Sequence, residues 1–161
     1  MLLLSSFHSG NIPFLQIARE VIAALLIMLF LYAGLSKWLD FRTFIGEMNN
    51  QPFPKGLIPF LVWAIPSLEI TIVIALVIER TRMVGLYTSF VFMTLFTTYA
   101  SAILLHFFAY IPCSCGGLIR RLSWRQHLVF NFFFVILSIT GIILQHRKSS
   151  KINLITKNSF V

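Results

Sequence analysis

Residues 57–78 read LIPFLVWAIPSLEITIVIALVI, an apolar run that carries a single charged side chain, Glu69. A helix of about 20 apolar residues is long enough to cross the ~30 Å hydrocarbon core of a bilayer. Three further apolar stretches of similar length occupy residues 17–35, 83–108 and 126–144. The sequence therefore predicts an all-α fold, an integral membrane four-helix bundle.

The composition supports a membrane protein and argues against nucleic-acid binding. Of the 161 residues, 58% are hydrophobic and only 11% are charged, less than half the charged share of a typical soluble domain. A net charge of +8 would suggest nucleic acid as a partner for a soluble protein. Here the Lys and Arg residues gather at the ends of the apolar runs, where they bind lipid headgroups and set topology. We therefore expect the lipid bilayer as the partner of this charge.

The chain divides into three predicted parts. Residues 1–16 form an N-terminal segment, residues 17–144 form one domain with the four spans, and residues 145–161 form a basic C-terminal tail. Four spans place both termini on the same face of the membrane. Lys and Arg are slightly more numerous on that face, which favours cytoplasmic termini. We therefore expect a bacterial inner-membrane protein whose connection between the third and fourth spans is periplasmic.

The end of the first span and the connection after it also carry a pattern. Lys37 and Trp38 are expected to be interfacial anchors. The connection that follows contains apolar residues at helical spacing, namely Phe41, Phe44, Ile45 and Met48. This spacing predicts a short amphipathic helix lying in the membrane interface.

Both cysteines of the chain lie in residues 112–117, PCSCGG, between the third and fourth spans. A disulfide between Cys113 and Cys115 would close a tight ring, and such a strained bond is more oxidising than a relaxed one. Pro112, Gly116 and Gly117 are expected to shape the loop, because glycine adopts backbone conformations closed to other residues.

Three arginines follow the cysteines, and two interpretations of them stay open. Arg120, Arg121 and Arg125 can favour the thiolate form and so raise thiol reactivity. They can equally anchor the loop to lipid headgroups. Just before Arg125 begins a predicted capping box, Ser123 to Gln126, which marks the start of the last helix.

The two cysteines also allow readings other than redox chemistry. They can be inert, or they can supply two soft ligands to copper(I) or zinc. A tetrahedral site needs two more ligands, and the nearby candidates are His106 and His127. Because that set is incomplete within the loop, we predict no metal ligands.

Glu69 is the second predicted functional feature, because an ionisable group deep in a span is costly and should face the bundle interior. It is expected either to relay protons or to hydrogen-bond a stripe of hydroxyls on the third span, which includes Thr94, Thr97, Thr98 and Ser101. These small polar residues predict close helix packing and hydrogen bonds between helices. Tyr32 and Asn131 are expected to be packing groups.

Several motifs, taken in order, resemble the DoxX-like and MauE membrane proteins. They are residues 30–41, FLYAGLSKWLDF; a second span with Trp63, Pro66 and Glu69; and residues 79–82, ERTR. The CSCGG loop and residues 122–124, LSW, resemble the MauE branch in particular. The resemblance covers residues 17–144. Where the family usually has Cys-Gly-Cys, this chain has Ser114 between the cysteines.

The resemblance implies a four-helix inner-membrane protein linked to periplasmic thiol–disulfide chemistry and protein maturation, beside a thioredoxin-like partner. MauE itself is tied to maturation of methylamine dehydrogenase, a client that we do not carry over to this chain. We therefore predict electron exchange through Cys113 and Cys115, which is the chemistry of a thiol–disulfide oxidoreductase. A quinone is the candidate electron acceptor, because a membrane oxidant must be regenerated. The alternatives are a non-catalytic membrane scaffold or assembly factor, a copper or zinc handling protein, and a small-molecule transporter that would need to oligomerise.

Overall fold

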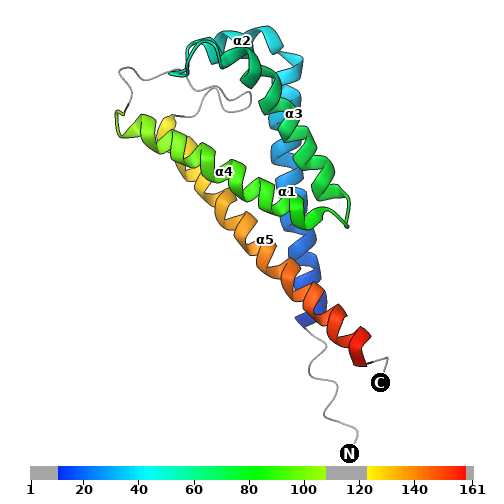
Figure 1. The fold of residues 1–161 in the computed structure, drawn as a ribbon. Helices are drawn as coiled ribbons and strands as arrows, with labels where there is room; N and C mark the ends of the chain where they lie inside the picture. The colour runs from blue at the N-terminus through cyan, green and yellow to red at the C-terminus, as the bar shows by residue number, and fades with distance from the viewer. Residues whose placement is uncertain (1–10, 108–122, 159–161) are drawn as a thin grey trace, which may run out of the picture.

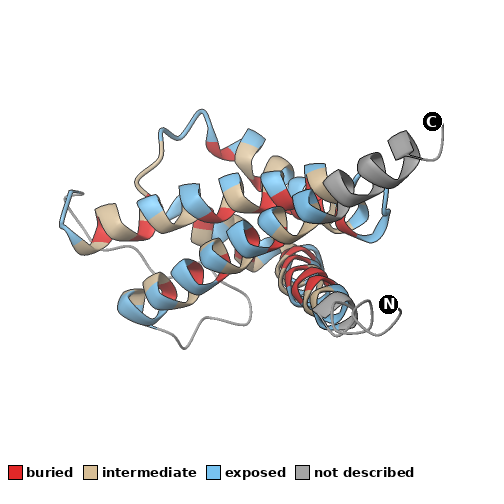
Figure 2. Ribbon diagram, turned by 90° about the horizontal axis from the view of Figure 1, so that it is seen from below, coloured by how far each residue is buried: buried red, intermediate tan, exposed pale blue. Residues whose placement is uncertain are grey.

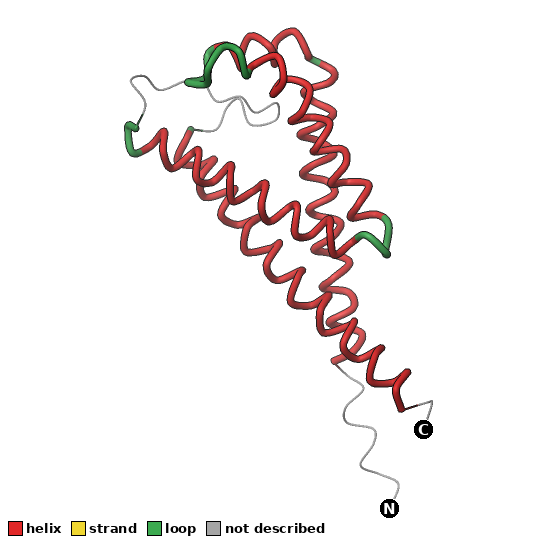
Figure 3. Tube along the Cα trace, viewed as in Figure 1, coloured by secondary structure: helices red, strands yellow, loops and turns green. Residues whose placement is uncertain are grey.

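The computed structural model describes residues 11–107 and 123–158 (Figure 1). This part of the chain folds into helices joined by short loops (Figure 3). Their bounds are α1 Asn11–Leu39, α2 Phe41–Asn49, α3 Ile58–Val77, α4 Arg82–Leu104 and α5 Trp124–Asn158. The described residues contain no strand, so the predicted all-α fold is confirmed.

Four of these helices are long and apolar enough to cross a membrane, as predicted. Their candidate spans are Phe14–Leu39, Ile58–Val77, Arg82–Leu104 and Trp124–Arg147. The first span extends four residues beyond the predicted end at residue 35, and helix α5 continues to Asn158 instead of ending near residue 144. Apolarity decides where a span leaves the bilayer, whereas backbone hydrogen bonds continue through any residues that tolerate helix.

The spans pair as α1 with α3 and α4 with α5. The two pairs meet where α3 turns into α4 and diverge towards α2, so that they form a V (Figure 1). We call the meeting point the packed end; it includes Ile22, Gly85, Leu86 and Gly141. We call the other end the open end; there α1 and α4 finish and α5 begins. A hydrophobic core, which includes Leu26, Phe30, Ile72, Leu76 and Leu86, holds the pairs together. The buried faces of the helices point inward (Figure 2).

Backbones come unusually close at the packed end. A Cβ atom at Gly85 would lie 2.8 Å from the backbone nitrogen of Leu76 on α3. Arg82 adds a hydrogen bond across the same turn, because its Nε donates to the carbonyl oxygen of Leu76 at 3.1 Å. Only glycine, which has no Cβ, allows α4 to begin this close to α3.

Helix α2 confirms the predicted amphipathic segment. Phe44 and Met48 are buried against Ile58 and Val62 of α3. The remaining positions of α2 are exposed or half-buried, which gives the helix one apolar and one polar face. It therefore covers the start of α3 at the open end.

The hydroxyl stripe of the third span does not bond to a neighbouring helix as we expected. Thr94, Thr97, Thr98 and Ser101 each donate to the carbonyl oxygen four residues earlier in α4. Thr and Ser hydroxyls satisfy themselves on their own helix backbone when no better acceptor is near. The prediction of bonds between helices was wrong for these residues.

Candidate functional site

The cysteine segment begins and ends at the open end of the bundle. Residues 108–122 lie outside the described residues, and most predicted site residues fall there: Pro112, Cys113, Cys115, Gly116, Gly117, Arg120 and Arg121. The described chain stops after Phe107, beyond the end of α4, and resumes at Ser123 before α5 (Figure 1). Both attachment points therefore lie at the open end.

The start of α5 is fixed by the predicted capping box. The backbone N–H of Ser123 donates to Gln126 Oε1 at 2.8 Å, and the Gln126 N–H donates to Ser123 Oγ at 3.4 Å. This reciprocal pair satisfies backbone donors that a helix N-terminus otherwise leaves open. Arg125 lies on the exposed face of this first turn, so it can reach solvent or lipid headgroups.

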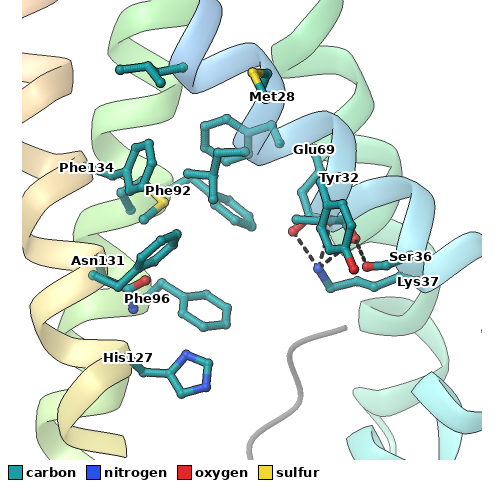
Figure 4. Close-up of a pocket in the computed structure, with 16 residues that line it drawn as sticks. Met28, Tyr32, Ser36, Lys37, Glu69, Phe92, Phe96, His127, Asn131 and Phe134 are labelled. Atoms are coloured by element: carbon teal, nitrogen blue, oxygen red, sulfur yellow. Dashed lines mark hydrogen bonds and ion pairs between the residues drawn. The ribbon is translucent and has the colours of Figure 1, made fainter. Parts of the chain in front are cut away.

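Glu69 lies at the interior of the bundle, as predicted, but its partner is Lys37 of α1. The Lys37 Nζ atom lies 2.7 Å from Glu69 Oε1 and 3.0 Å from Oε2, and it donates a third bond to the carbonyl oxygen of Ala33 at 3.1 Å (Figure 4). The Lys37 and Glu69 side chains are only 9% and 4% exposed. All three ammonium hydrogens are therefore used within the protein.

This geometry overturns the expectation that Lys37 is an interfacial anchor. A buried carboxylate needs a buried cation or a proton, because an unpaired charge inside a low-dielectric medium costs several kcal/mol. The signal was present in the sequence: Lys37 is a lone cation close to the end of one span, and Glu69 is a lone acid in the next. We missed the pair because we predicted that the first span ends at residue 35, before Lys37.

A cavity of about 330 Å³ opens beside this ion pair, between the two arms of the V. Its walls are mainly aromatic, with Phe92, Phe96, Phe130 and Phe134 among the lining residues. The polar lining residues are Tyr32, Ser36, Lys37 and Glu69 on α1 and α3, and His127 and Asn131 on α5 (Figure 4). Tyr32 and Asn131, expected to be packing groups, therefore face a cavity.

A second cavity of about 340 Å³ lies beside the first, towards the open end. Lys37, Phe92, Phe96 and His127 line both spaces. Trp124, on the first turn of α5, lines the second cavity. The helix that follows the cysteine segment thus begins on a cavity wall.

The metal alternative is not supported by the described residues. Within residues 11–107 and 123–158, no three His, Cys, Asp or Glu side chains are close enough to hold a metal ion. His106 is exposed beyond the end of α4, whereas His127 is buried on α5. Because the cysteines lie outside this part of the chain, the expectation that they bind no metal stays a prediction.

Comparison with known families gives a match over most of the chain. The model of the family described as "Methylamine utilisation protein MauE" matches residues 15–144, which include all of α2, α3 and α4 and most of α1. Comparison with curated proteins and with solved structures gave no match. The matched region holds all or most of each of the four candidate spans, the Lys37–Glu69 pair and the segment with both cysteines, and the chain therefore belongs to the MauE family.

Proposed function

We propose that this multi-pass membrane protein exchanges electrons through Cys113 and Cys115 with a periplasmic thioredoxin-like protein during the maturation of another protein. A thiolate of one protein attacks the disulfide of the other and forms a mixed disulfide, which a second thiolate then resolves. When the chain accepts electrons, two electrons and two protons leave the partner's thiols. The partner gains a disulfide and the chain is left with two thiols.

The observation that supports the proposal most strongly is the position of the two cysteines. They are the only two in the chain and are separated by one residue, in the segment that joins the end of α4 to the start of α5. A pair at a membrane face can meet a water-soluble partner, whereas a pair inside the bundle cannot. Disulfide exchange is chemically sensible on the periplasmic side, which is oxidising.

Membership of the MauE family suggests the biological process in which this chemistry takes place. The family's description suggests a membrane protein of methylamine utilisation. We place the chain in the bacterial inner membrane with cytoplasmic termini, which puts the cysteines on the side of a periplasmic partner. Pro112, Gly116 and Gly117 shape the loop, and Arg120, Arg121 and Arg125 favour the thiolate.

Trapping a mixed disulfide tests the proposal. In the single variants Cys113→Ser and Cys115→Ser, the remaining thiol cannot resolve the intermediate, so a disulfide-linked adduct should accumulate in cells. We expect mass spectrometry to identify a thioredoxin-like protein in the adduct, and reducing agent to release it. The matched control is Ser114→Ala, which keeps both thiols and should give no adduct.

The same variants separate redox chemistry from a scaffold role. Alkylation with a thiol-specific mass tag reports the oxidation state of both cysteines in cells. Cysteines that stay reduced with and without the thioredoxin-like protein would contradict electron exchange. Full maturation of the client by Cys113→Ser/Cys115→Ser would point to the non-catalytic scaffold instead.

A further inference from the structure

The aromatic cavity beside Lys37 and Glu69 has the properties of a site for a planar apolar ligand. Its volume of about 330 Å³ falls within the ~300–1,000 Å³ of small-molecule sites. Phe92, Phe96 and Phe134 present ring faces and edges to it (Figure 4), and aromatic rings favour offset or edge-on contact with another ring. Because the cavity lies among the membrane-spanning helices, a ligand dissolved in the bilayer can reach it from the side.

One buried donor in this cavity lacks an acceptor. Asn131 is 4% exposed, and within the described residues its Nδ2 group has no hydrogen-bond partner. A buried donor without an acceptor costs about 1–3 kcal/mol. The side chain lies on the α5 wall of the cavity, opposite α1 and α3 (Figure 4). The cavity therefore favours a ligand that carries a hydrogen-bond acceptor.

The ion pair decides against an anionic ligand. Both Glu69 oxygens and the Ala33 carbonyl take up the three Nζ hydrogens of Lys37. The pair is neutral as a whole and leaves no ammonium hydrogen for a phosphate or carboxylate headgroup. A neutral acceptor, such as a ketone oxygen, fits these polar groups better.

We propose that this cavity binds the ring of a membrane-soluble quinone, with the Asn131 amide donating a hydrogen bond to a carbonyl oxygen of the ring. Phe92, Phe96 and Phe134 pack against the ring, and Tyr32 places a hydroxyl on the opposite wall. A quinone combines the required features: a flat apolar ring, neutral carbonyl acceptors and solubility in lipid.

The proposal rests on the proposed thiol chemistry for its physiological purpose. Oxidation of the Cys113 and Cys115 thiols to a disulfide releases two electrons and two protons. A quinone accepts both pairs and becomes the hydroquinone, so the reaction balances without another oxidant. Binding itself does not require the cysteines, and it can therefore be measured separately.

Photoaffinity labelling of the full chain in lipid nanodiscs tests the site. The probe is a short-chain ubiquinone with an azido group, and the protein is the Cys113→Ser/Cys115→Ser variant, because free thiols can reduce the azide and consume the probe. We expect saturable labelling of peptides from α1, α4 and α5, suppressed by decylubiquinone. Decylbenzene has the same tail and a ring without carbonyls, and it should compete at least about tenfold more weakly.

Two substitutions locate the ligand in the cavity. Asn131→Leu removes the donor and should weaken decylubiquinone binding about tenfold or more, without loss of helical structure, since it also removes an unsatisfied buried amide. Phe96→Trp places a larger side chain in both cavities and should also weaken decylubiquinone binding. The matched control is Thr140→Leu on the same helix, whose hydroxyl is exposed and bonds to its own backbone; it should leave the affinity unchanged.

Labelling that does not saturate, or equal competition by decylbenzene, would overturn the proposal and assign the cavity to lipid chains. Equal affinity of the Asn131→Leu and Thr140→Leu variants would also overturn it. The two proposals fail separately. Quinone binding without any mixed disulfide contradicts the thiol chemistry alone, whereas a mixed disulfide without quinone binding contradicts the cavity site alone.

Discussion

The packed end and the open end of this bundle differ in how closely the helices approach one another. At the packed end, Gly85 lies so close to α3 that a Cβ atom would come within 2.8 Å of a backbone atom, and Gly141 sits equally near the side chain of Leu86. At the open end, the same four helices diverge around cavities of about 330 and 340 Å³. At the packed end the helices are in close contact. At the open end aromatic and polar side chains line cavities between the helices.

The charged pairs follow the same division. Towards the N-terminal end of α1, Arg82 Nη1 lies 2.8 Å from Glu20 Oε1; the Arg82 side chain is 12% exposed, but the Glu20 side chain is 52% exposed, so water reaches the carboxylate. Near the cavities, Lys37 and Glu69 are both almost fully buried. Exposed pairs contribute little to stability, whereas breaking a buried pair is costly because it leaves one charge uncompensated. The difference implies that stability is most sensitive to charge where the packing is loosest.

Removing one partner of the buried pair should have the largest effect. Glu69→Leu leaves Lys37 charged and unpaired, so we expect a loss of about 3–5 kcal/mol in the free energy of unfolding. The double variant Lys37→Met/Glu69→Leu should recover most of that loss, since apolar replacement of both partners is often neutral. Reversible unfolding in detergent or bicelles measures both. Equal destabilisation of the single and double variants would show that packing, not charge, is responsible.

Two alanine substitutions at the packed end should have smaller and unequal effects. Gly85→Ala forces a backbone shift against Leu76 and Ala75, and overpacking costs about 1–3 kcal/mol. Gly141→Ala meets only the side-chain tips of Leu86 and Ile22, which can move, and it gains roughly 0.5–1 kcal/mol of helix propensity. Thermal unfolding of both variants should show a clear loss for Gly85→Ala and a change near zero for Gly141→Ala. A larger loss for Gly141→Ala than for Gly85→Ala would mean that α4 does not approach the backbone of α3 closely at Gly85.

The exposed pair should give the smallest effect. Glu20→Gln keeps the shape of the side chain and removes its charge, so we expect a loss of about 0–1 kcal/mol. The loss should shrink as salt is raised, because screening weakens exposed pairs. Unfolding at low and high salt measures it. A loss as large as that of Glu69→Leu, insensitive to salt, would remove the distinction between the two ends.

Local sequence patterns predicted the helices well. The four apolar runs, the spacing of Phe44 and Met48 in α2 and the Ser123–Gln126 capping box all depend on residues a few positions apart. Helix formation and capping are decided over one or two turns, so the chain itself carries the information. The ends of α1 and α5 were placed too early because polarity marks the membrane boundary, not the end of the helix.

The candidate site was only partly predictable. Because Glu69 is an isolated acid within a span, the sequence predicted that it faces the bundle interior. Its pairing with Lys37 depends on the lateral packing of α1 against α3. Tyr32 and Asn131 looked like packing groups because a single polar residue in a span does not reveal whether it faces a neighbour or a cavity. The roles of Cys113 and Cys115 stay predictions, since they lie outside the described residues.

By itself, the sequence determined that this protein has four apolar helices, an amphipathic connecting helix and a cysteine pair between the last two spans. Hydrophobic length, helical period and capping chemistry are properties of consecutive residues. Only the tertiary structure decided that the helix pairs form a V, that Lys37 neutralises Glu69 and that Asn131 faces an aromatic cavity. These features arise where side chains from different helices meet, and the close approach at Gly85 helps to set that geometry.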